Sequence, residues 1–241
     1  MREKSNGIVL NMVPYNDKSS FVHIYTEKFG TVTYSVPNTR GKRTRMSKAL
    51  FIPFNILEME VEHAPGREIQ KMAEVRPVGL HLTLLADPVK GAVTLFLAEF
   101  LSRTIREQEP NPTLYRFIAD SFALYDILEE GKANFHLVFL LKISEFLGFR
   151  INRESFREGY GLDMLEGTFT SGQPEHAWFL NPAEAYLFHT ILQMQYSNMH
   201  TYQLNREHRT VLLDQIVLYF RLHLPELREI KSLEVLKSLF Q

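Results

Sequence analysis

The chain has 241 residues, of which 27 are Lys or Arg and 28 are Asp or Glu, so its formal net charge is −1 at pH 7. A hydrophobic fraction of 45% beside 23% charged residues favours a folded globular protein and disfavours a disordered or fibrous one. Because the chain has no cysteine, disulfides, thiolate zinc sites and cysteine nucleophiles are excluded as well.

The first part of the chain, to about residue 77, alternates short apolar runs with turn signals. Alternation with period two predicts five strands, at residues 7–12, 21–26, 31–36, 50–62 and 68–75. The turn signals include Gly30 and the Pro65-Gly66 pair. Five short strands, without helices long enough for parallel crossovers, predict a small antiparallel barrel or sandwich.

Beyond residue 87 the pattern becomes helical. Three pairs each place an N-cap residue before a proline at the first helical position: Asp87-Pro88, Asn111-Pro112 and Asn181-Pro182. Apolar stripes predict helices that include residues 93–101, 114–125, 135–146, 183–196 and 206–223, and a last short helix follows Ser232. The sequence therefore predicts an α+β chain, with a barrel domain at 1–80 and an all-helical domain at 88–241 that carries an irregular insert at about 150–178.

Charge divides between the same two parts of the chain. Residues 1–80 carry a net charge of +4, and residues 81–241 carry −5. From residue 28 to residue 57 there is no acidic side chain, but there are six basic ones: Lys28, Arg40, Lys42, Arg43, Arg45 and Lys48. Such a run indicates an anionic partner, and a solvated hairpin tip is the alternative interpretation.

Targeting signals and metal motifs are lacking in the sequence. The apolar run at residues 7–10 is too short for a signal peptide, and no segment approaches the roughly 18 consecutive apolar residues of a membrane span. We therefore expect a cytoplasmic protein without a membrane partner. The nine histidines stand singly, without a spacing that would put two imidazoles on one helix face, so no metal or other cofactor is expected.

Catalytic motifs are lacking too. The Gly41-Lys42 pair is not part of a P-loop, because Val36 stands where the first glycine belongs and Arg43 follows where Ser or Thr is needed. The three glutamates at 58, 60 and 62 are interpreted as the outward face of a strand, since period two places all of them on one side. Nothing in the sequence supports an enzyme, although a hydrolase or nuclease with a dispersed site is a rival interpretation.

A cationic barrel that bears aromatic side chains is typical of oligonucleotide-binding (OB) folds, in which cations neutralise phosphates and bases stack on rings. The available rings are Tyr15, Phe21, Tyr25, Phe29 and Tyr34, and each of them can equally fill the barrel interior. We expect phosphate contacts from five side chains, Arg40, Lys42, Arg43, Arg45 and Lys48. Lys28 and Arg2 are lesser candidates.

Partial matches in a fixed order run along nearly the whole chain. They begin with residues 7–10, Tyr15, the Tyr25-Thr26-Glu27-x-x-Gly30 stretch, and a basic segment that leads into residues 50–54. They continue with residues 139–149, 163–169 and several short stretches between 209 and 236. This series resembles the RecO family of bacterial recombination mediators, and the resemblance lies in the order of the matches, since no single motif is diagnostic.

The resemblance implies an N-terminal OB barrel, a helical C-terminal domain and no enzymatic turnover. It also implies binding of single- and double-stranded DNA, annealing of complementary strands, and partnership with RecR. The family recognises the acidic C-terminal tail of single-strand binding protein, so that recombinase can be loaded. The implied location is the bacterial cytoplasm, with association to the nucleoid during repair.

Two features of the helical part complete these expectations. Many family members carry a cysteine-bound zinc module near the position of residues 150–176; this chain cannot, so either the segment packs through Phe156, Tyr160 and Phe169 or it is mobile. For the acidic tail, three arginines on one predicted helix are candidates, Arg206, Arg209 and Arg221, beside an apolar stripe of Leu212, Leu213, Ile216 and Phe220.

Two interpretations of these features stay open. The apolar stripe can be core, with the three arginines solvated. For the chain as a whole, the alternative function is a non-enzymatic interaction scaffold whose barrel binds acidic peptides.

Overall fold

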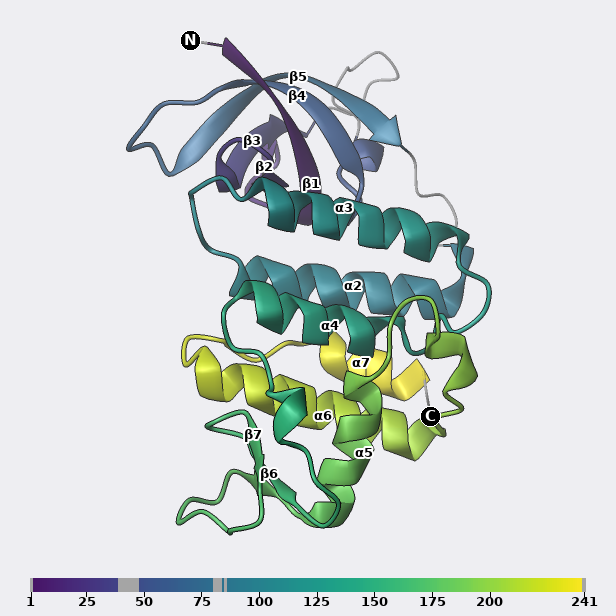
Figure 1. The fold of residues 1–241 in the computed structure, drawn as a ribbon. Helices are drawn as coiled ribbons and strands as arrows, with labels where there is room; N and C mark the ends of the chain where they lie inside the picture. Colours follow the sequence, from purple (N-terminus) through teal and green to yellow (C-terminus); the bar gives the residue numbers. More distant parts are fainter. Residues whose placement is uncertain (1, 39–47, 80–83, 85, 240–241) are drawn as a thin grey trace. The chain divides into compact units, whose positions relative to one another are not determined.

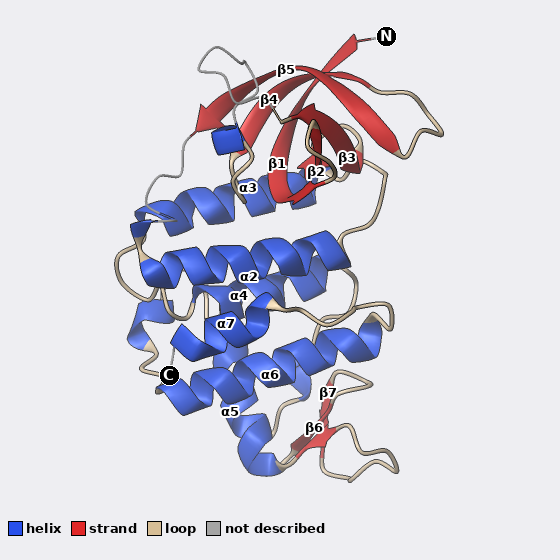
Figure 2. Ribbon diagram, turned by 180° about the vertical axis from the view of Figure 1, so that it is seen from behind, coloured by secondary structure: helices blue, strands red, loops and turns tan. Residues whose placement is uncertain are grey.

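A computed structural model describes residues 2–38, 48–79, 84 and 86–239 (Figure 1). Five long strands come first: β1 (Arg2–Pro14), β2 (Ser19–Thr26), β3 (Gly30–Pro37), β4 (Ile56–Glu62) and β5 (Ile69–Gly79). The helices that follow are α2 (Pro88–Thr104), α3 (Pro112–Ile127), α4 (Phe135–Phe146), α5 (Pro182–Leu192), α6 (Arg206–His223) and α7 (Ser232–Leu239). Between α4 and α5 lie three short strands, β6 (Gly161–Asp163), β7 (Thr168–Thr170) and β8 (Phe179–Leu180), as the colouring by element in Figure 2 shows.

By compactness the chain divides into two units. The first unit comprises Met1–Ile127 and Ile230–Leu236, and the second comprises Leu128–Glu229 and Lys237–Gln241. Helices α2 and α3 thus belong to the same unit as the five long strands. This division falls later than the change from strand to helix near residue 80, on which the expected domains 1–80 and 88–241 were based.

The five long strands close into a barrel in the order β1-β2-β3-β5-β4. All pairs are antiparallel except β3 with β5, where Thr33 lies opposite Ile69. Strand β1 pairs with both β2 and β4, and Gly7 takes part in both pairings. A Cβ atom at Gly7 would lie only 2.5 Å from side-chain carbons of Ile24 and Met59, so the closure point needs a residue without a side chain.

The barrel core follows from the period-two pattern of the strands. Buried apolar side chains alternate along them and include Val9, Val22, Ile24, Tyr34, Leu57, Met59 and Val61. The glutamates of β4 point to the opposite side, as predicted. The predicted α+β fold, an OB-like barrel followed by helices, is confirmed.

The predicted strand 50–62 is wrong in its first half. Residues Lys48–Leu50 form a short 3-10 helix, and regular pairing begins only at Ile56. Pro53 lacks the N–H that a strand ladder needs, and Phe54 has a positive φ of 63°. The ring of Phe54 is fully buried and stacks on Phe122 of α3, with 3.3 Å between the ring centroids.

The three predicted N-caps are present. The Asp87 carboxylate accepts hydrogen bonds from the backbone N–H groups of Val89 and Lys90, and Asn111 accepts one from Leu114. Asn181 and Glu184 form a capping box at the start of α5. Each of these caps satisfies backbone donors that no helical carbonyl can reach, which is why the local sequence sufficed to place the helix starts.

The stretch expected to be irregular forms an antiparallel three-stranded sheet in the order β7-β6-β8. Phe156 packs it against α5: its ring stacks on His189, with 3.6 Å between centroids, and meets Phe169 edge-on at 5.1 Å. Strands of two or three residues are too short for a periodic signal, which is why the sequence did not predict them.

In the part of the chain that the structure describes, no group of three or more His, Cys, Asp or Glu side chains could hold a metal ion. Over the same residues, every helix is too short or too polar to cross a membrane.

His136 of α4 creates a pH dependence in the second unit. The side chain is fully buried, and this burial, together with the charge of Arg209, lowers the pKa of His136 to about 3. The imidazole is therefore neutral in the folded chain, whereas in the unfolded chain it takes up a proton below about pH 6.5. Since the unfolded state then binds more protons, stability falls as the pH drops from about 6.5 towards 3.

We predict that the free energy of unfolding in urea is lower at pH 5 than at pH 7, and that His136→Leu reduces this difference. His208→Leu, at an exposed position of α6, is the matched control and should leave the pH dependence as in the parent chain. An unchanged pH dependence in a folded His136→Leu variant would mean that other groups cause the loss of stability at low pH.

Candidate nucleic-acid interface

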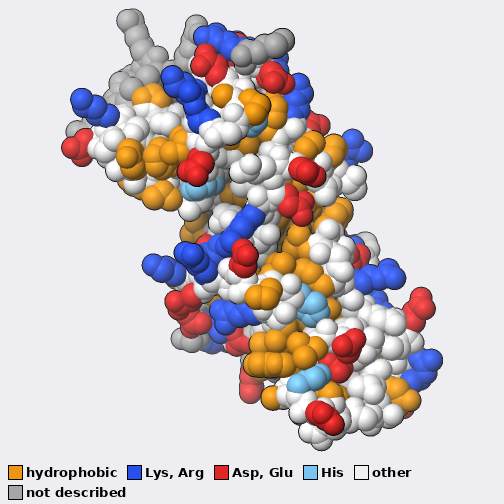
Figure 3. Space-filling model, turned by 90° about the vertical axis from the view of Figure 1, so that its left-hand side faces the viewer, with side chains coloured by type: hydrophobic (Ala, Val, Ile, Leu, Met, Phe, Trp, Pro, Cys, Tyr) orange, Lys and Arg blue, Asp and Glu red, His pale blue; other side chains and the backbone are white. Residues whose placement is uncertain are grey.

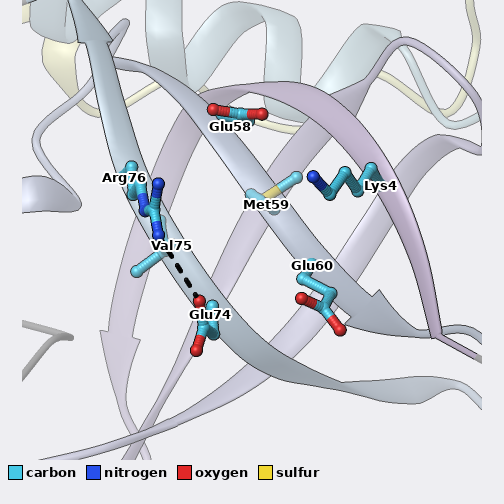
Figure 4. A pocket seen from close by; sticks show the side chains of 7 residues that line it. All are labelled: Lys4, Glu58, Met59, Glu60, Glu74, Val75 and Arg76. Atoms are coloured by element: carbon cyan, nitrogen blue, oxygen red, sulfur yellow. Dashed lines mark ion pairs between the residues drawn. The ribbon is translucent and has the colours of Figure 1, made fainter.

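The outer face of strands β1, β4 and β5 carries equal numbers of basic and acidic side chains. Its basic side chains are Arg2, Lys4, Lys71 and Arg76, and its acidic ones are Glu58, Glu60, Glu62 and Glu74. Lys4 lies opposite Glu60 in the strand register, and Arg76 lies opposite Glu58. Figure 4 shows five of these side chains, Lys4, Glu58, Glu60, Glu74 and Arg76, around a cavity of about 180 Å³. The ion pair between Arg76 and Glu74 measures 3.9 Å.

Arg2, a lesser candidate for phosphate contact, lies in this charged face. One guanidinium nitrogen is 3.6 Å from the Glu60 carboxylate, and the Nε atom donates a hydrogen bond of 3.5 Å to Glu62. A phosphate that approached Arg2 would also meet the four glutamates of this face, which repel it. The face is therefore unsuited to nucleic acid.

The outer face of β2 and β3 has no acidic side chain. Its side chains are Phe21, His23, Thr31, Thr33 and Ser35, with Tyr25 covered by Tyr115 of α3. His23 shares a hydrogen bond of 3.0 Å with Thr33, and burial lowers the pKa of His23, so its ring is neutral at pH 7. Because the face itself is uncharged, the loops at its edges decide whether an anion is attracted to it.

The basic segment leaves the barrel beside the turn that joins β1 and β2. The Asn38 amide donates a hydrogen bond of 2.8 Å to the Asn16 carbonyl, and its backbone N–H donates to Lys18 O at 2.7 Å. Asn38 is the last residue before the segment with Arg40, Lys42, Arg43 and Arg45, which lies outside the described residues. Lys48, where the described chain resumes, is exposed.

Lys18 is a cation that sequence reasoning missed. It is exposed in the β1–β2 turn, directly at the point where the basic segment leaves the barrel. In the sequence it stands 22 residues before Arg40 and next to Asp17, so no local charge pattern marks it. The pairing of β2 with β3 and the hydrogen bonds of Asn38 bring the two regions together.

The candidate aromatic residues divide into two groups. Tyr25 and Tyr34 are only 1% and 0% exposed, so they are core residues and cannot stack on a base. Burial, with a contribution from Glu107, raises the pKa of Tyr25 to about 12. Tyr15 is 64% exposed and stacks on Phe21, with 4.4 Å between the ring centroids. Phe29, the remaining candidate, is half-buried and stacks on His63.

Lys28 lies apart from the other cations. It is exposed in the turn between β2 and β3, at the end of the barrel opposite Asn38. Strand β2 has eight residues, which corresponds to about 25 Å between the two ends. Acidic residues also lie near this turn, because the Thr31 N–H donates to the backbone oxygen of Glu107 at 2.9 Å. Lys28 therefore cannot share a phosphate with the basic segment.

The arginines proposed for the acidic tail have different environments. Arg206 and Arg221 are exposed near the ends of α6, whereas Arg209 is half-buried and donates hydrogen bonds to the Asn134 side chain at 3.2 Å and to Leu204 O at 2.9 Å. The stripe between them, Leu212, Leu213, Ile216 and Phe220, is fully buried. The stripe is thus part of the core rather than a groove. Arg209 connects α6 to the start of α4 through its hydrogen bond to Asn134.

A groove with exposed apolar side chains occurs instead in the first unit. Its volume is about 420 Å³, and it lies between β1, α2 and α7. Leu95 and Val235 are 48% and 54% exposed there, with Arg103 and Lys231 among the lining side chains. Glu99 shapes the groove, because its carboxylate accepts hydrogen bonds from the backbone of Lys231 and Ser232 and pairs with Arg103.

Surface charge elsewhere is mixed. On the face that Figure 3 presents, basic and acidic side chains are interspersed, with hydrophobic side chains between them. Together with the net charge of −1, this arrangement means that attraction of a polyanion depends on local groups rather than on the field of the whole chain.

Comparisons with known proteins agree with this architecture. Residues 1–81 match the family model "Recombination protein O N terminal", and residues 85–234 match "Recombination protein O C terminal". Proteins named DNA repair protein RecO are similar over the full length of both chains. The one from Azobacteroides pseudotrichonymphae is 37% identical over 240 residues, that from Bacteroides fragilis YCH46 39% over 241, and that from Flavobacterium psychrophilum 30% over 242. The chain therefore belongs to the RecO family of DNA repair proteins.

Proposed function

We propose that this chain is a recombination mediator that binds and anneals single-stranded DNA and helps to load recombinase onto strands coated by single-strand binding protein. The observation that carries the proposal is the acid-free outer face of β2 and β3, bordered by the point where the basic segment leaves the barrel. The face of β1, β4 and β5 has four glutamates beside its four cations, with Arg2 and Arg76 in ion pairs, and so offers a phosphate little attraction.

In this proposal, phosphates lie along the edge formed by the basic segment, Lys48 and Lys18. A base can stack on the exposed pair Tyr15–Phe21, which is adjacent to that edge. Each neutralised phosphate releases condensed counterions, so affinity depends steeply on salt and weakly on sequence. Double-stranded DNA offers the same phosphates and is expected to bind to the same edge.

Annealing follows from the same electrostatics. Two complementary strands repel each other through their phosphates, and a cationic segment between them screens this repulsion. The base pairs that form are the strands' own, so no bond in the DNA is made or broken by the protein. The proposal therefore includes no enzymatic turnover and no cofactor; cleavage of DNA in the presence of magnesium would contradict it.

The proposed protein partners are RecR and the acidic C-terminal tail of single-strand binding protein, in the bacterial cytoplasm and at the nucleoid during repair. For the tail we favour the groove between α2 and α7 over the α6 stripe. The groove has exposed apolar side chains and the exposed ammonium group of Lys231, which together complement a peptide of acidic and apolar residues.

We predict that the double change Arg43→Ala and Arg45→Ala weakens binding of labelled single-stranded DNA. It should reduce the slope of log affinity against log salt by roughly one for each lost contact. The matched control is Arg2→Ala. It removes a cation that is already paired with glutamates on the face of β1, β4 and β5, so it should leave the slope unchanged. If the folded double variant binds with the parent affinity and slope, the basic segment is not the phosphate site. No binding at any salt would favour the interaction scaffold instead.

We predict that Lys231→Glu weakens binding of a peptide with the sequence of the single-strand binding protein tail, whereas Arg206→Glu retains it. Both positions are exposed, so neither change should unfold the chain. Titration by fluorescence anisotropy measures the effect. The reverse result, loss with Arg206→Glu alone, would place the tail on α6. Arg209→Glu is not a useful probe, because it breaks hydrogen bonds that hold α6 in place.

A further inference from the structure

A second cavity of the barrel, of about 270 Å³, lies on the outer side of β3 beside the turn between β4 and β5. Its lining combines two aromatic rings with hydroxyl, amide and charged groups: Phe29, His63, Thr31, Thr33, Gln70, Gln108, Arg67 and Glu68. This volume is at the lower limit of sites for small ligands, which span roughly 300–1,000 Å³, so it suits one small planar group.

The walls of the cavity are held rigidly. The buried amide of Gln70 accepts a hydrogen bond from Ala64 N at 2.9 Å and donates to Ala64 O at 2.9 Å and to Arg67 O at 2.6 Å. Thr31 donates its hydroxyl hydrogen to Ile105 O at 2.8 Å. These bonds fix the β4–β5 turn and the α2–α3 loop around the cavity, so its shape does not depend on a ligand.

One wall is a flat aromatic pair. The rings of Phe29 and His63 are 4.3 Å apart between centroids and only 9° from parallel. Both side chains are half-buried, and Phe29 also packs against the barrel core. A third planar ring can extend such a stack, and stacking on aromatic side chains is how proteins hold unstacked bases.

Polar groups with free bonding capacity complete the lining. The side chain of Gln108 forms no hydrogen bond within the described part of the chain, and its amide offers both a donor and an acceptor. Arg67 adds an exposed guanidinium group on the β4–β5 turn. An amide beside an aromatic wall matches the edge of a nucleobase, which also presents donors and acceptors side by side.

The cavity borders the acid-free face. Thr33 lines the cavity and is also paired across the sheet with His23, two residues from Phe21. On β3, Thr33 stands two residues from Ser35, the partner of Phe21, which is about 7 Å along the strand. A single strand that contacts the Tyr15–Phe21 pair can therefore reach the cavity within a few nucleotides.

We propose that this cavity binds one unstacked nucleobase of a single DNA strand, which stacks on the Phe29–His63 pair and hydrogen-bonds through its edge to Gln108. The inference rests on the proposed function, because it assigns a subsite to the strand that the barrel binds. A base held there cannot pair, so the strand must leave the cavity for annealing at that position.

The test uses the full chain and a short oligothymidylate that carries a single 2-aminopurine, a base whose fluorescence is quenched by stacking. We expect the parent chain to quench it, and Phe29→Leu to remove most of the quenching and to weaken binding about tenfold, since base stacking on a ring is lost. Gln108→Ala, at an exposed position, should weaken binding without a loss of fold. The matched control Tyr186→Leu removes an exposed ring of the second unit and should change neither signal.

The outcomes separate the two proposals. If the oligonucleotide binds with a steep salt dependence but both cavity variants quench and bind as the parent does, the cavity is not a base site and the proposed function stands. If the parent chain does not bind the oligonucleotide at any salt, both proposals fail. Circular dichroism of Phe29→Leu confirms its fold, and Gln108→Ala decides the question if that variant does not fold.

Discussion

Closure of the barrel is the constraint on which its charge asymmetry depends. Because β4 lies between β5 and β1, Glu60 lies opposite Lys4 in one ladder and Glu58 lies opposite Arg76 in the other, and Arg2 of β1 forms ion pairs with Glu60 and Glu62. Closure in turn requires Gly7 at the point where β1 changes partners. The strand order therefore gathers the compensated charges on the face of β1, β4 and β5, while the face of β2 and β3 carries no acidic side chain.

Amide side chains hold the loops at the two ends of the uncharged face of β2 and β3. Asn38 ties the exit of the basic segment to the β1–β2 turn, and Gln70 holds the β4–β5 turn at the other end. In both cases a side-chain amide satisfies backbone groups of a loop that has no ladder of its own. Binding residues on loops need such support, because a rigid frame fixes where the loops begin and end.

Features that depend on nearby residues could be predicted from the sequence, whereas contacts between residues far apart in the chain could not. The N-caps before Pro88 and Pro182, and the outward glutamates of β4, depend on neighbours within a few residues. The stacking of Phe54 needs Phe122, and the hydrogen bond of Arg209 needs Asn134. For the candidate site, the basic segment was visible as a charge run, but its neighbour Lys18 and the cavity beside Phe29 arise from contacts between residues far apart in the chain.

The burial of aromatic rings bears on how such a protein could anneal strands. Tyr25 and Tyr34 belong to the core, which leaves the pairs Tyr15–Phe21 and Phe29–His63 as the candidate rings that reach the surface of the described barrel. A protein that stacked every base would compete with base pairing. Under the proposed function, few rings and many cations mean that most of the affinity would come from phosphates, and this sequence-independent attraction would leave the base edges of most nucleotides free. Under the proposed function, the same scarcity of exposed rings that limits affinity is what permits the bound strand to pair.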